Sequence, residues 1–337
     1  VLEEHLNLAA KGILMPNGKV PEVGSRLIQS DKAKTLGLLA EHGPDAFYKG
    51  EVAEKIVASV RKAGGVMTLE DMAAYTVRWR EALHGVWRGM DIYSFPPPSS
   101  GGAVLLRMLH GVGQGRDLKE AGWHSSHEIH ILVELMKRAY AGRNLFLADP
   151  DHADVPIERF TDPAAGKRDR RAIRKRATPA KRILNPRELI RNERSHTSHF
   201  SIVDGEGNAV SQTQTINLTF GSGIVAEGTG VVLNNEIDDF STSPGKPNAF
   251  GLVQGSVNNI APGKRPLSSM TPTIVLRDGS VDAVVGSPGG SFIITSVFQT
   301  LLNRYVHRMD PGSAVCMPRI HHQWLPDAIA AEPFAIS

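Results

Sequence analysis

Cysteine is almost absent from this chain of 337 residues. The single cysteine, Cys316, excludes an internal disulfide framework and a cysteine-based zinc site. Charge is nearly balanced, since 38 Lys and Arg against 35 Asp and Glu leave a net charge of +3, which does not favour a nucleic-acid or polyanion binder. No apolar run approaches the roughly 18 residues of a membrane span, and the opening Val-Leu-Glu-Glu-His lacks the pattern of a secretion signal. The 41% of hydrophobic residues are enough to build a globular core.

The first part of the chain reads mostly as helices. Val52, Ile56 and Val60 recur at helical spacing and predict a helix that ends at Gly64-Gly65. The other elements expected here are a short helix at 69–75, paired strands within 76–95, a loop at 96–102 and a long helix that starts after a capping box at 125–128 and ends before 149.

A strongly basic stretch follows these helices. Twelve Lys or Arg residues lie between Lys167 and Arg194, with few apolar residues among them. This composition favours a solvated, mobile connector, which we assign to residues 165–196. An arm that binds nucleic acid is the alternative, but no aromatic residues are interleaved to stack on bases.

After the connector the pattern changes to strands. Residues 197–204 alternate, with Phe200 and Ile202 on one face and Thr197 and His199 on the other. The elements expected next are a turn at 205–208, a returning strand at 209–215, a second hairpin at 271–285, a glycine-rich loop at 286–291 and a helix at 292–305. Helices before the connector and hairpins after it predict a layered sheet-and-helix architecture.

The Gly-Ser-Pro-Gly-Gly-Ser loop at 286–291 is the clearest local signal of a functional site. A glycine-rich turn between a strand and a helix can present backbone N–H groups to an anion, either a phosphate or the oxyanion of an acyl-transfer intermediate. The loop lacks the Lys-Ser/Thr ending of a phosphate loop and the spacing of a dinucleotide fingerprint. A tight turn that needs glycine only for its backbone angles is the alternative.

Two further polar segments are candidates. The adjacent Ser268 and Ser269 can donate hydrogen bonds to a carboxylate, and the segment 234–239 can hold an ammonium group or a cation. Each segment also has a plain structural interpretation, as a solvated serine pair and as an acidic turn. The sequence alone leaves both alternatives open.

The histidines suggest a competing metal site. His124, His127 and His130, with Glu134, have a helical spacing that could bring imidazoles and a carboxylate together. A complete ligand set is not evident, and the intervening residues follow an ordinary core-helix pattern, so no metal site is expected. No Gly-x-Ser-x-Gly elbow is present, which disfavours a conventional serine hydrolase.

Several ordered blocks closely resemble the gamma-glutamyltranspeptidase family. The blocks similar to its small subunit are Thr197–Asp204, Asn217–Gly221, Leu233–Ser241, Arg265–Met270 and Gly286–Ser291. The blocks similar to the later part of its large subunit are Gly43–Gly50, Leu69–Asp71 and Pro96–Gly102. The resemblance covers nearly the whole chain except the basic connector.

The resemblance implies the fold of an N-terminal nucleophile hydrolase, an α+β protein with a four-layer αββα sandwich. Residues 1–196 then correspond to the C-terminal part of the large subunit, and residues 197–337 to the catalytic small subunit. In that family the large subunit begins further upstream and the small subunit continues with further strands. We therefore expect this chain to be truncated at both ends.

The resemblance also implies self-activation. The family is made as one chain that cuts itself before a threonine, which corresponds here to the bond between His196 and Thr197. Thr197 then becomes the nucleophile, and its freed α-amine, with an unperturbed pKa near 8, can remove the hydroxyl proton. By the same resemblance Thr215 orients Thr197, and the backbone N–H groups of Gly289 and Gly290 form the oxyanion hole.

Substrate contacts follow from the resemblance as well. Ser268 and Ser269 are expected to hold the α-carboxylate of a glutamyl donor. Its α-ammonium is expected to be held by Asn217, Glu236 and Asp239. The motif of the family's arginine that pairs with the donor carboxylate was not found in this chain. Phe250 occupies a lid-like segment where relatives often have tyrosine.

The implied activity is transfer of a γ-glutamyl group through a γ-glutamyl-threonine intermediate. Glutathione is the expected donor, and water, an amino acid or a peptide is the acceptor. No cofactor, metal, nucleic acid or membrane span is expected, and the two cleaved pieces form a heterodimer. Because bacterial relatives are generally exported, a periplasmic or secreted location is expected.

Three alternatives remain at this stage. A cephalosporin or glutaryl-amide acylase shares the scaffold and the threonine, although Glu236, Asp239, Ser268 and Ser269 suit an amino-acid head group better. An inactive truncated homologue is the non-enzymatic alternative. A nucleic-acid-binding protein that uses the basic connector is the third, and it predicts salt-sensitive retention on DNA.

Overall fold

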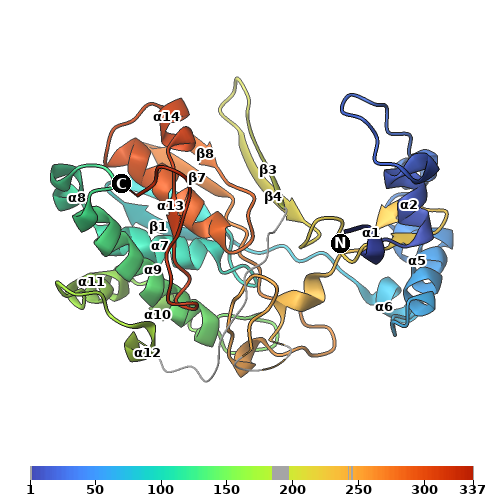
Figure 1. Cartoon of the computed structure of the whole chain (residues 1–337), viewed down its shortest axis with the longest axis horizontal. Coiled ribbons are helices and arrows are strands. Elements are labelled where there is room, and N and C mark those ends of the chain that lie inside the picture. The colour runs from blue at the N-terminus through green and yellow to red at the C-terminus, as the bar shows by residue number, and fades with distance from the viewer. Residues whose placement is uncertain (1, 184–196, 242, 244–245, 337) are drawn as a thin grey trace. The chain divides into compact units, whose positions relative to one another are not determined.

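The computed structural model contains two compact units (Figure 1). It describes residues 2–183, 197–241, 243 and 246–336. Unit 1 comprises Val1–Trp79 and Ile216–Asn235, and unit 2 comprises Arg80–Thr215 and Glu236–Ser337. Each unit combines segments from both sides of residue 196. The expected division of the chain into residues 1–196 and 197–337 therefore does not coincide with the two compact units. That the chain is cut at this point stays a prediction.

Unit 1 consists of short helices and a two-stranded sheet. Its elements are α1 (Leu2–His5), α2 (Leu8–Leu14), the 3-10 helix η1 (Pro16–Gly18), α3 (Ser30–His42), α4 (Asp45–Tyr48), α5 (Glu51–Lys62), α6 (Leu69–Ala74), β5 (Val225–Ala226) and β6 (Val231–Val232). The apolar stripe expected on α5 is buried, with Val52 and Ile56 in one cluster with Ala226. Thr68 and Asp71 cap α6 reciprocally, as the sequence predicts.

A four-stranded antiparallel sheet forms the centre of unit 2. In spatial order its strands are β1 (Leu83–Trp87), β2 (Met90–Ser94), β7 (Thr273–Arg277) and β8 (Ser280–Val285). The two expected hairpins, β1–β2 and β7–β8, are confirmed. They join through β2 and β7, where Ile92 lies opposite Val275 and both side chains are fully buried. The sheet therefore combines segments from before and after the predicted cut.

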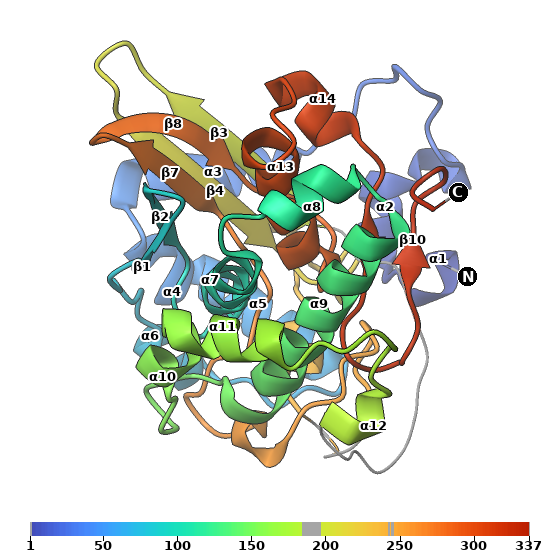
Figure 2. The same ribbon diagram turned by 90° about the vertical axis from the view of Figure 1, so that its left-hand side faces the viewer.

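Helices pack around this sheet. They are α7 (Gly101–Val112), α8 (Arg116–Ala121), α9 (Ser126–Phe146), α10 (Ile157–Thr161), α11 (Pro163–Arg171), α12 (Ala180–Ile183), α13 (Phe292–Tyr305) and α14 (Pro311–Cys316). α7 is buried along nearly its whole length and contacts β1, β2, α9 and α13 (Figure 2). Gly85 permits this contact, because a Cβ there would lie 2.6 Å from Cδ2 of Leu106. Among the described residues, no helix is long and apolar enough to cross a membrane.

The hairpin of β3 (Thr197–Val203) and β4 (Ala209–Thr215) packs against β7 and β8 through its polar face. Ser201 Oγ donates to the Val284 carbonyl at 3.2 Å, while Phe200 and Ile202 on the other face are 39% and 54% exposed. The alternation expected from the sequence is present. The short hydroxyl side chains pack inward because they can satisfy carbonyl groups of β8. Unit 2 is thus a mixed α/β structure, and the four-layer αββα sandwich remains a prediction.

The described part of the basic stretch folds onto unit 2. In α11, Asp169 Oδ2 lies 2.6 Å from Nε of Arg107. At α12, the Ala180 N–H donates to Asp327 at 2.8 Å, and Trp324 Nε1 donates to the Ala180 carbonyl at 3.0 Å. Up to residue 183 the stretch therefore contains two helices with partners in unit 2, and the mobile connector expected from its charge stays a prediction. Residues 184–196, which include His196, lie outside the described residues.

Candidate active site

Thr197 begins strand β3 and faces Thr215 across the hairpin. The two residues are paired in the strand register, and Thr197 Oγ1 donates to Thr215 Oγ1 at 3.4 Å. Thr197 is half-buried, so its hydroxyl is neither sealed in the core nor fully solvated. In the uncut chain the Thr197 nitrogen belongs to a peptide bond, and it becomes an amine only after cleavage.

The glycine loop lies between β8 and α13, as the sequence predicts. Gly289 and Gly290 have φ angles of +127° and +54°, which L residues with side chains rarely adopt. Within the described part of the chain, no hydrogen bond is formed by the N–H of either glycine. Together with the N-terminus of α13, these two N–H groups form a region that can stabilise a negatively charged oxygen.

Close contact between His199 and Gly286 fixes the hairpin against this loop. A Cβ on Gly286 would lie 2.1 Å from Cε1 of His199, so only glycine fits there. The ring is held from its own hairpin, because His199 Nδ1 and Thr213 Oγ1 are 2.8 Å apart. Burial lowers the pKa of His199, which favours the neutral ring. Sequence reasoning placed His199 on the correct face but missed this positioning contact.

The serine pair lies beside the Pro-Pro-Pro-Ser-Ser-Gly-Gly loop at residues 96–102. Ser268 N–H donates to the Pro98 carbonyl at 2.8 Å, and Ser100 N–H donates to the Ser268 carbonyl at 2.9 Å. Gly101 allows this approach, since a Cβ there would lie 2.2 Å from the Met270 carbonyl oxygen. The sequence identified both loops as separate blocks, and the structure brings them together.

Arg143 of α9 lies fully buried beneath the serine pair, and sequence reasoning missed it. Its Nε donates to Ser100 Oγ at 2.9 Å, and its Nη2 donates to Ser269 Oγ at 3.1 Å. Burial lowers the pKa of Arg143 to about 10, so the guanidinium is still charged at neutral pH. A lone arginine in an ordinary helical pattern gives no sequence signal of this role.

Glu236 and Asp239 form an acidic pair in the 3-10 helix η2 (Glu236–Asp239). Burial raises the pKa of both carboxyl groups, and the charge of Glu236 raises that of Asp239 further. The positive charge of Arg143 acts in the opposite direction on Asp239. The surroundings of the pair therefore disfavour the state in which both carboxyls are charged.

A chain of hydrogen bonds runs from the acidic pair to the glycine loop. Its steps are Asn248 Nδ2 to Asp239 Oδ1 at 3.4 Å, Phe250 N–H to Asn248 Oδ1 at 3.0 Å, Gln323 Nε2 to the Phe250 carbonyl at 2.8 Å and Ser291 Oγ to Gln323 Oε1 at 2.7 Å. The segment around Phe250 is therefore attached to both candidate sites. The proposed lid function of Phe250, whose side chain is buried, stays a prediction.

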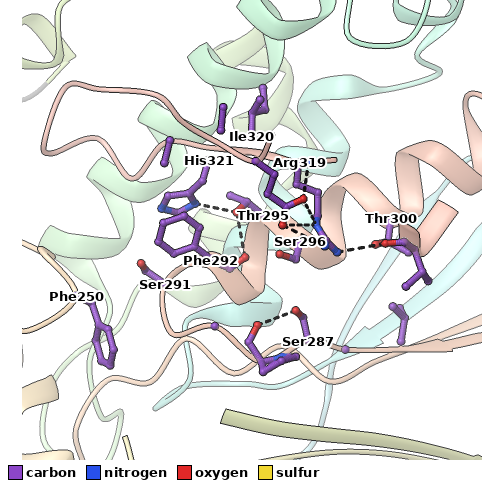
Figure 3. Close-up of a pocket in the computed structure, with 18 residues that line it drawn as sticks. Phe250, Ser287, Ser291, Phe292, Thr295, Ser296, Thr300, Arg319, Ile320 and His321 are labelled. Carbon is purple, nitrogen blue, oxygen red and sulfur yellow. Dashed lines mark hydrogen bonds and ion pairs between the residues drawn. The ribbon is translucent and has the colours of Figure 1, made fainter. Parts of the chain in front are cut away.

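A cavity of about 790 Å³ opens beside the glycine loop (Figure 3). Phe250 and Phe292 line it, together with residues 285–289. His321, in β9 (Ile320–His321), stacks on Phe292 with ring centroids 4.0 Å apart. Burial lowers the pKa of His321 to about 4, so its ring is neutral at neutral pH. The cavity wall thus combines aromatic rings with hydroxyl side chains and the ion pair of Arg319 and Glu332, a mixture that suits a small-molecule ligand.

Asn217 and the histidines considered as a metal site are two separate cases. Asn217 belongs to unit 1, where its Nδ2 donates to the Asn235 carbonyl at 3.1 Å, and its part in donor binding stays a prediction. The histidines considered as metal ligands do not share a site, because His124 and His130 form hydrogen bonds with two different backbone carbonyls. Glu134 forms an ion pair with Arg138. In the described part of the chain, no cluster of three or more His, Cys, Asp or Glu residues could hold a metal ion.

Known proteins resemble this chain over nearly its whole length. A family profile described as Gamma-glutamyltranspeptidase matches residues 2–337. The glutathione hydrolase proenzyme of Escherichia coli (strain K12) is 45% identical over 334 residues, which cover 98% of this chain and 57% of that protein. The glutathione hydrolase proenzyme of Pseudomonas aeruginosa is 46% identical over 319 residues, covering 93% and 56% respectively. The chain therefore spans about half the length of these relatives.

A solved structure supports the same relationship. The crystal structure of cephalosporin acylase from Bacillus halodurans matches with a TM-score of 0.79 and 26% sequence identity. The match covers 95% of this chain and 56% of that one. The fold of the chain is therefore similar to that of an acylase. Its sequence is similar to those of glutathione hydrolases.

Proposed function

The chain belongs to the gamma-glutamyltranspeptidase family, and we propose that it cleaves γ-glutamyl amides such as glutathione with Thr197 as the nucleophile. The observation that carries this proposal is the position of Thr197 at the start of β3, with its hydroxyl directed to Thr215. The similarity to glutathione hydrolase proenzymes supports the substrate class. Because the chain spans about half of those proteins, the complete activity is part of the proposal.

The first proposed step is activation by cleavage between His196 and Thr197. The Thr197 hydroxyl attacks the preceding carbonyl, the C–N bond breaks, and the acyl group passes to oxygen while the nitrogen takes up a proton. Water then hydrolyses the ester, which leaves a carboxylate on residue 196 and a free α-amine on Thr197. A threonine hydroxyl needs an adjacent base to be reactive, and this amine, with an unperturbed pKa near 8, supplies one.

Substrate cleavage reuses the same oxygen. The amine accepts the Thr197 hydroxyl proton as Oγ1 attacks the γ-carbonyl, and the tetrahedral oxyanion is stabilised by the N–H groups of Gly289 and Gly290. The proton passes to the leaving amine as the C–N bond breaks, which gives a γ-glutamyl ester on Thr197. Water, an amino acid or a peptide then accepts the glutamyl group. The nucleophile, the base and the oxyanion donors in these steps all belong to the chain, so no cofactor or metal is invoked.

The donor head is proposed to bind between the serine pair and the acidic pair. Arg143 donates to Ser269 Oγ, so the hydroxyl hydrogen of Ser269 remains available for the donor carboxylate. The α-ammonium is proposed to be held by Glu236 and Asp239, while the part expected of Asn217, which belongs to unit 1, stays a prediction. A bound ammonium favours the charged form of both carboxyls, so donor binding is expected to release a proton from the pair.

The two pieces are proposed to stay together after cleavage as a heterodimer of a large and a small subunit. The central sheet supports this, because β2 lies before the cut and its partner β7 lies after it. Separating the pieces would expose the fully buried Ile92 and Val275. By analogy with exported bacterial relatives, we also propose a periplasmic or secreted location.

An acylase that removes glutaryl groups is the second candidate, because of the likeness to a cephalosporin acylase. Glutaryl and γ-glutamyl groups differ by the α-ammonium, which only the second group can present to Glu236 and Asp239. Comparing turnover of γ-glutamyl-anilide and glutaryl-anilide therefore decides between them. Faster glutaryl turnover would reverse our assignment.

The proposal is tested with Thr197→Ala, and Ser280→Ala serves as a control at an exposed position at the start of β8. We expect the wild type and the control to give two bands on a denaturing gel and to hydrolyse γ-glutamyl-anilide. Thr197→Ala should give one band and no turnover. A wild-type chain that remains uncut and inactive would favour an inactive homologue instead.

A further inference from the structure

Four arginines from three segments of unit 2 surround a second cavity of about 560 Å³. They are Arg88 in the β1–β2 turn, Arg277 at the end of β7, Arg304 in the last turn of α13 and Arg308 just after it. We call this cavity the arginine pocket. It shares no lining residue with the cavity beside the glycine loop.

An aromatic pair supports three of these guanidinium groups. Trp87 and Tyr305 meet edge to face with ring centroids 6.2 Å apart. The Arg88 guanidinium lies 5.8 Å from the Trp87 ring, and those of Arg277 and Arg304 lie 5.7 Å and 6.0 Å from the Tyr305 ring. Such cation–π contacts hold arginine side chains in place while leaving most of their N–H donors unused. The pocket is therefore organised before any ligand binds.

The positive charge of the arginine pocket is only partly neutralised, because Asp278 is the one carboxylate among its lining residues. Arg277 forms an ion pair with Asp282 at 3.2 Å. In the part of the chain that the structure describes, Arg88, Arg304 and Arg308 have no carboxylate partner. Burial lowers the pKa of Arg88, and the nearby charge of Arg308 lowers it further. The second of these effects is the repulsion expected between like charges that lie close together.

We propose that the arginine pocket binds a small phosphate-bearing anion with two or more negative charges, such as a pyrophosphate group. Guanidinium groups match phosphate oxygens with paired hydrogen bonds, which favours phosphate over a simple halide. The pocket is concave and built from several loops and a helix end, so it suits a soluble ligand rather than a flat membrane surface. The site is independent of γ-glutamyl transfer and shares none of its residues.

Calorimetric titration of the full chain with inorganic pyrophosphate tests the proposal. The test variant is Arg304→Gln combined with Arg308→Gln, and the control is Arg159→Gln, an exposed arginine of α10 away from the pocket. We expect the wild type and the control to bind pyrophosphate equally. The double variant should bind at least about tenfold more weakly, which corresponds to losing one charge-assisted hydrogen bond.

Two further results decide the matter. Sodium chloride at matched ionic strength should not reproduce the heat of pyrophosphate binding, and equal effects of both salts would overturn the proposal. Without pyrophosphate, the double variant should melt at the same temperature as the wild type or above it, because like-charge repulsion has been removed. Equal pyrophosphate affinity in the wild type and the double variant would contradict the assigned site, as would no binding to the wild type.

Discussion

The central sheet and the β3–β4 hairpin of unit 2 are held by different forces. The sheet and α7 pack through fully buried apolar residues such as Ile92 and Leu106. The hairpin packs through short polar side chains and a close approach at Gly286, while Phe200 faces outward. Apolar burial contributes most to stability, whereas polar contacts add little net free energy but fix direction. Changes in the sheet should therefore alter stability first, and changes at the hairpin should alter activity first.

Arg143 is expected to give the largest effect, because it is a buried charge that bridges Ser100 and Ser269. Arg143→Met leaves Ser100, Ser269 and the acidic pair without their buried cation. Removing one partner from a buried charged network typically costs about 3–5 kcal/mol of stability. We expect a loss of that size in chemical denaturation.

Arg143→Lys is a second variant that tests the role of Arg143 even if the methionine variant does not fold. Lysine preserves the charge but cannot bridge Ser100 and Ser269 as the planar guanidinium does. The lysine variant should fold and show a raised KM for the donor with kcat less affected. An unchanged KM would argue against a positioning role at the serine pair.

Ile92→Ala tests the sheet. The side chain is fully buried in β2, so truncation should lower the free energy of unfolding by about 2–5 kcal/mol. Val86→Ala in β1 is the matched control, since Val86 is 55% exposed and should change stability by less than about 0.5 kcal/mol. At a temperature where both variants are folded, kcat/KM should stay near the wild-type value.

Gly286→Ala tests the hairpin side of the comparison. The added Cβ would meet the His199 ring, so the hairpin carrying Thr197 must shift relative to the glycine loop. A displacement of about 1 Å can lower activity about 100-fold, and we expect a loss approaching that with a smaller stability change than in Ile92→Ala.

Two companion variants sharpen this result. Gly205→Ala adds a methyl group in open space and should behave as wild type. Removing the ring in the double variant Gly286→Ala/His199→Ala should recover part of the lost activity, because the clash is relieved. No recovery would show that the contact between loop and hairpin is not what positions Thr197.

Asp239→Asn should give a smaller, pH-dependent effect. The raised pKa values of Glu236 and Asp239 mean that the folded chain binds more protons than the unfolded chain above about pH 4. Stability of the donor-free wild type should therefore fall, relative to Asp239→Asn, as pH rises from there. Melting temperatures of both proteins across pH 4–8 show whether the wild type loses stability relative to the variant. Parallel curves would contradict the raised pKa values of the acidic pair.

Much of the local structure could be predicted from the sequence. Alternation and turn residues predicted the three hairpins β1–β2, β3–β4 and β7–β8, and the capping residues at Thr68 and Ser125 predicted two helix starts. The glycine loop was recognisable because glycine is the residue that most readily adopts positive φ angles such as those of Gly289 and Gly290. These features depend on residues close together in the chain, which is why local patterns reveal them.

The misses concern contacts between distant segments. Arg143 lies more than a hundred residues before Ser269, and nothing in its helix indicates that a hydroxyl will be placed beside it. In the basic stretch, charge patterning does not show that Asp169 pairs with Arg107 or that Trp324 donates to the Ala180 carbonyl. The inward polar face of the hairpin was likewise hidden, since it depends on the carbonyl groups of β8.

Mass spectrometry of the purified, active chain tests the central claim most directly. The account predicts two polypeptides, the smaller of which begins with Thr197 carrying an unmodified α-amine. An active preparation that consists only of the uncut chain, or one cut at another bond, would contradict it.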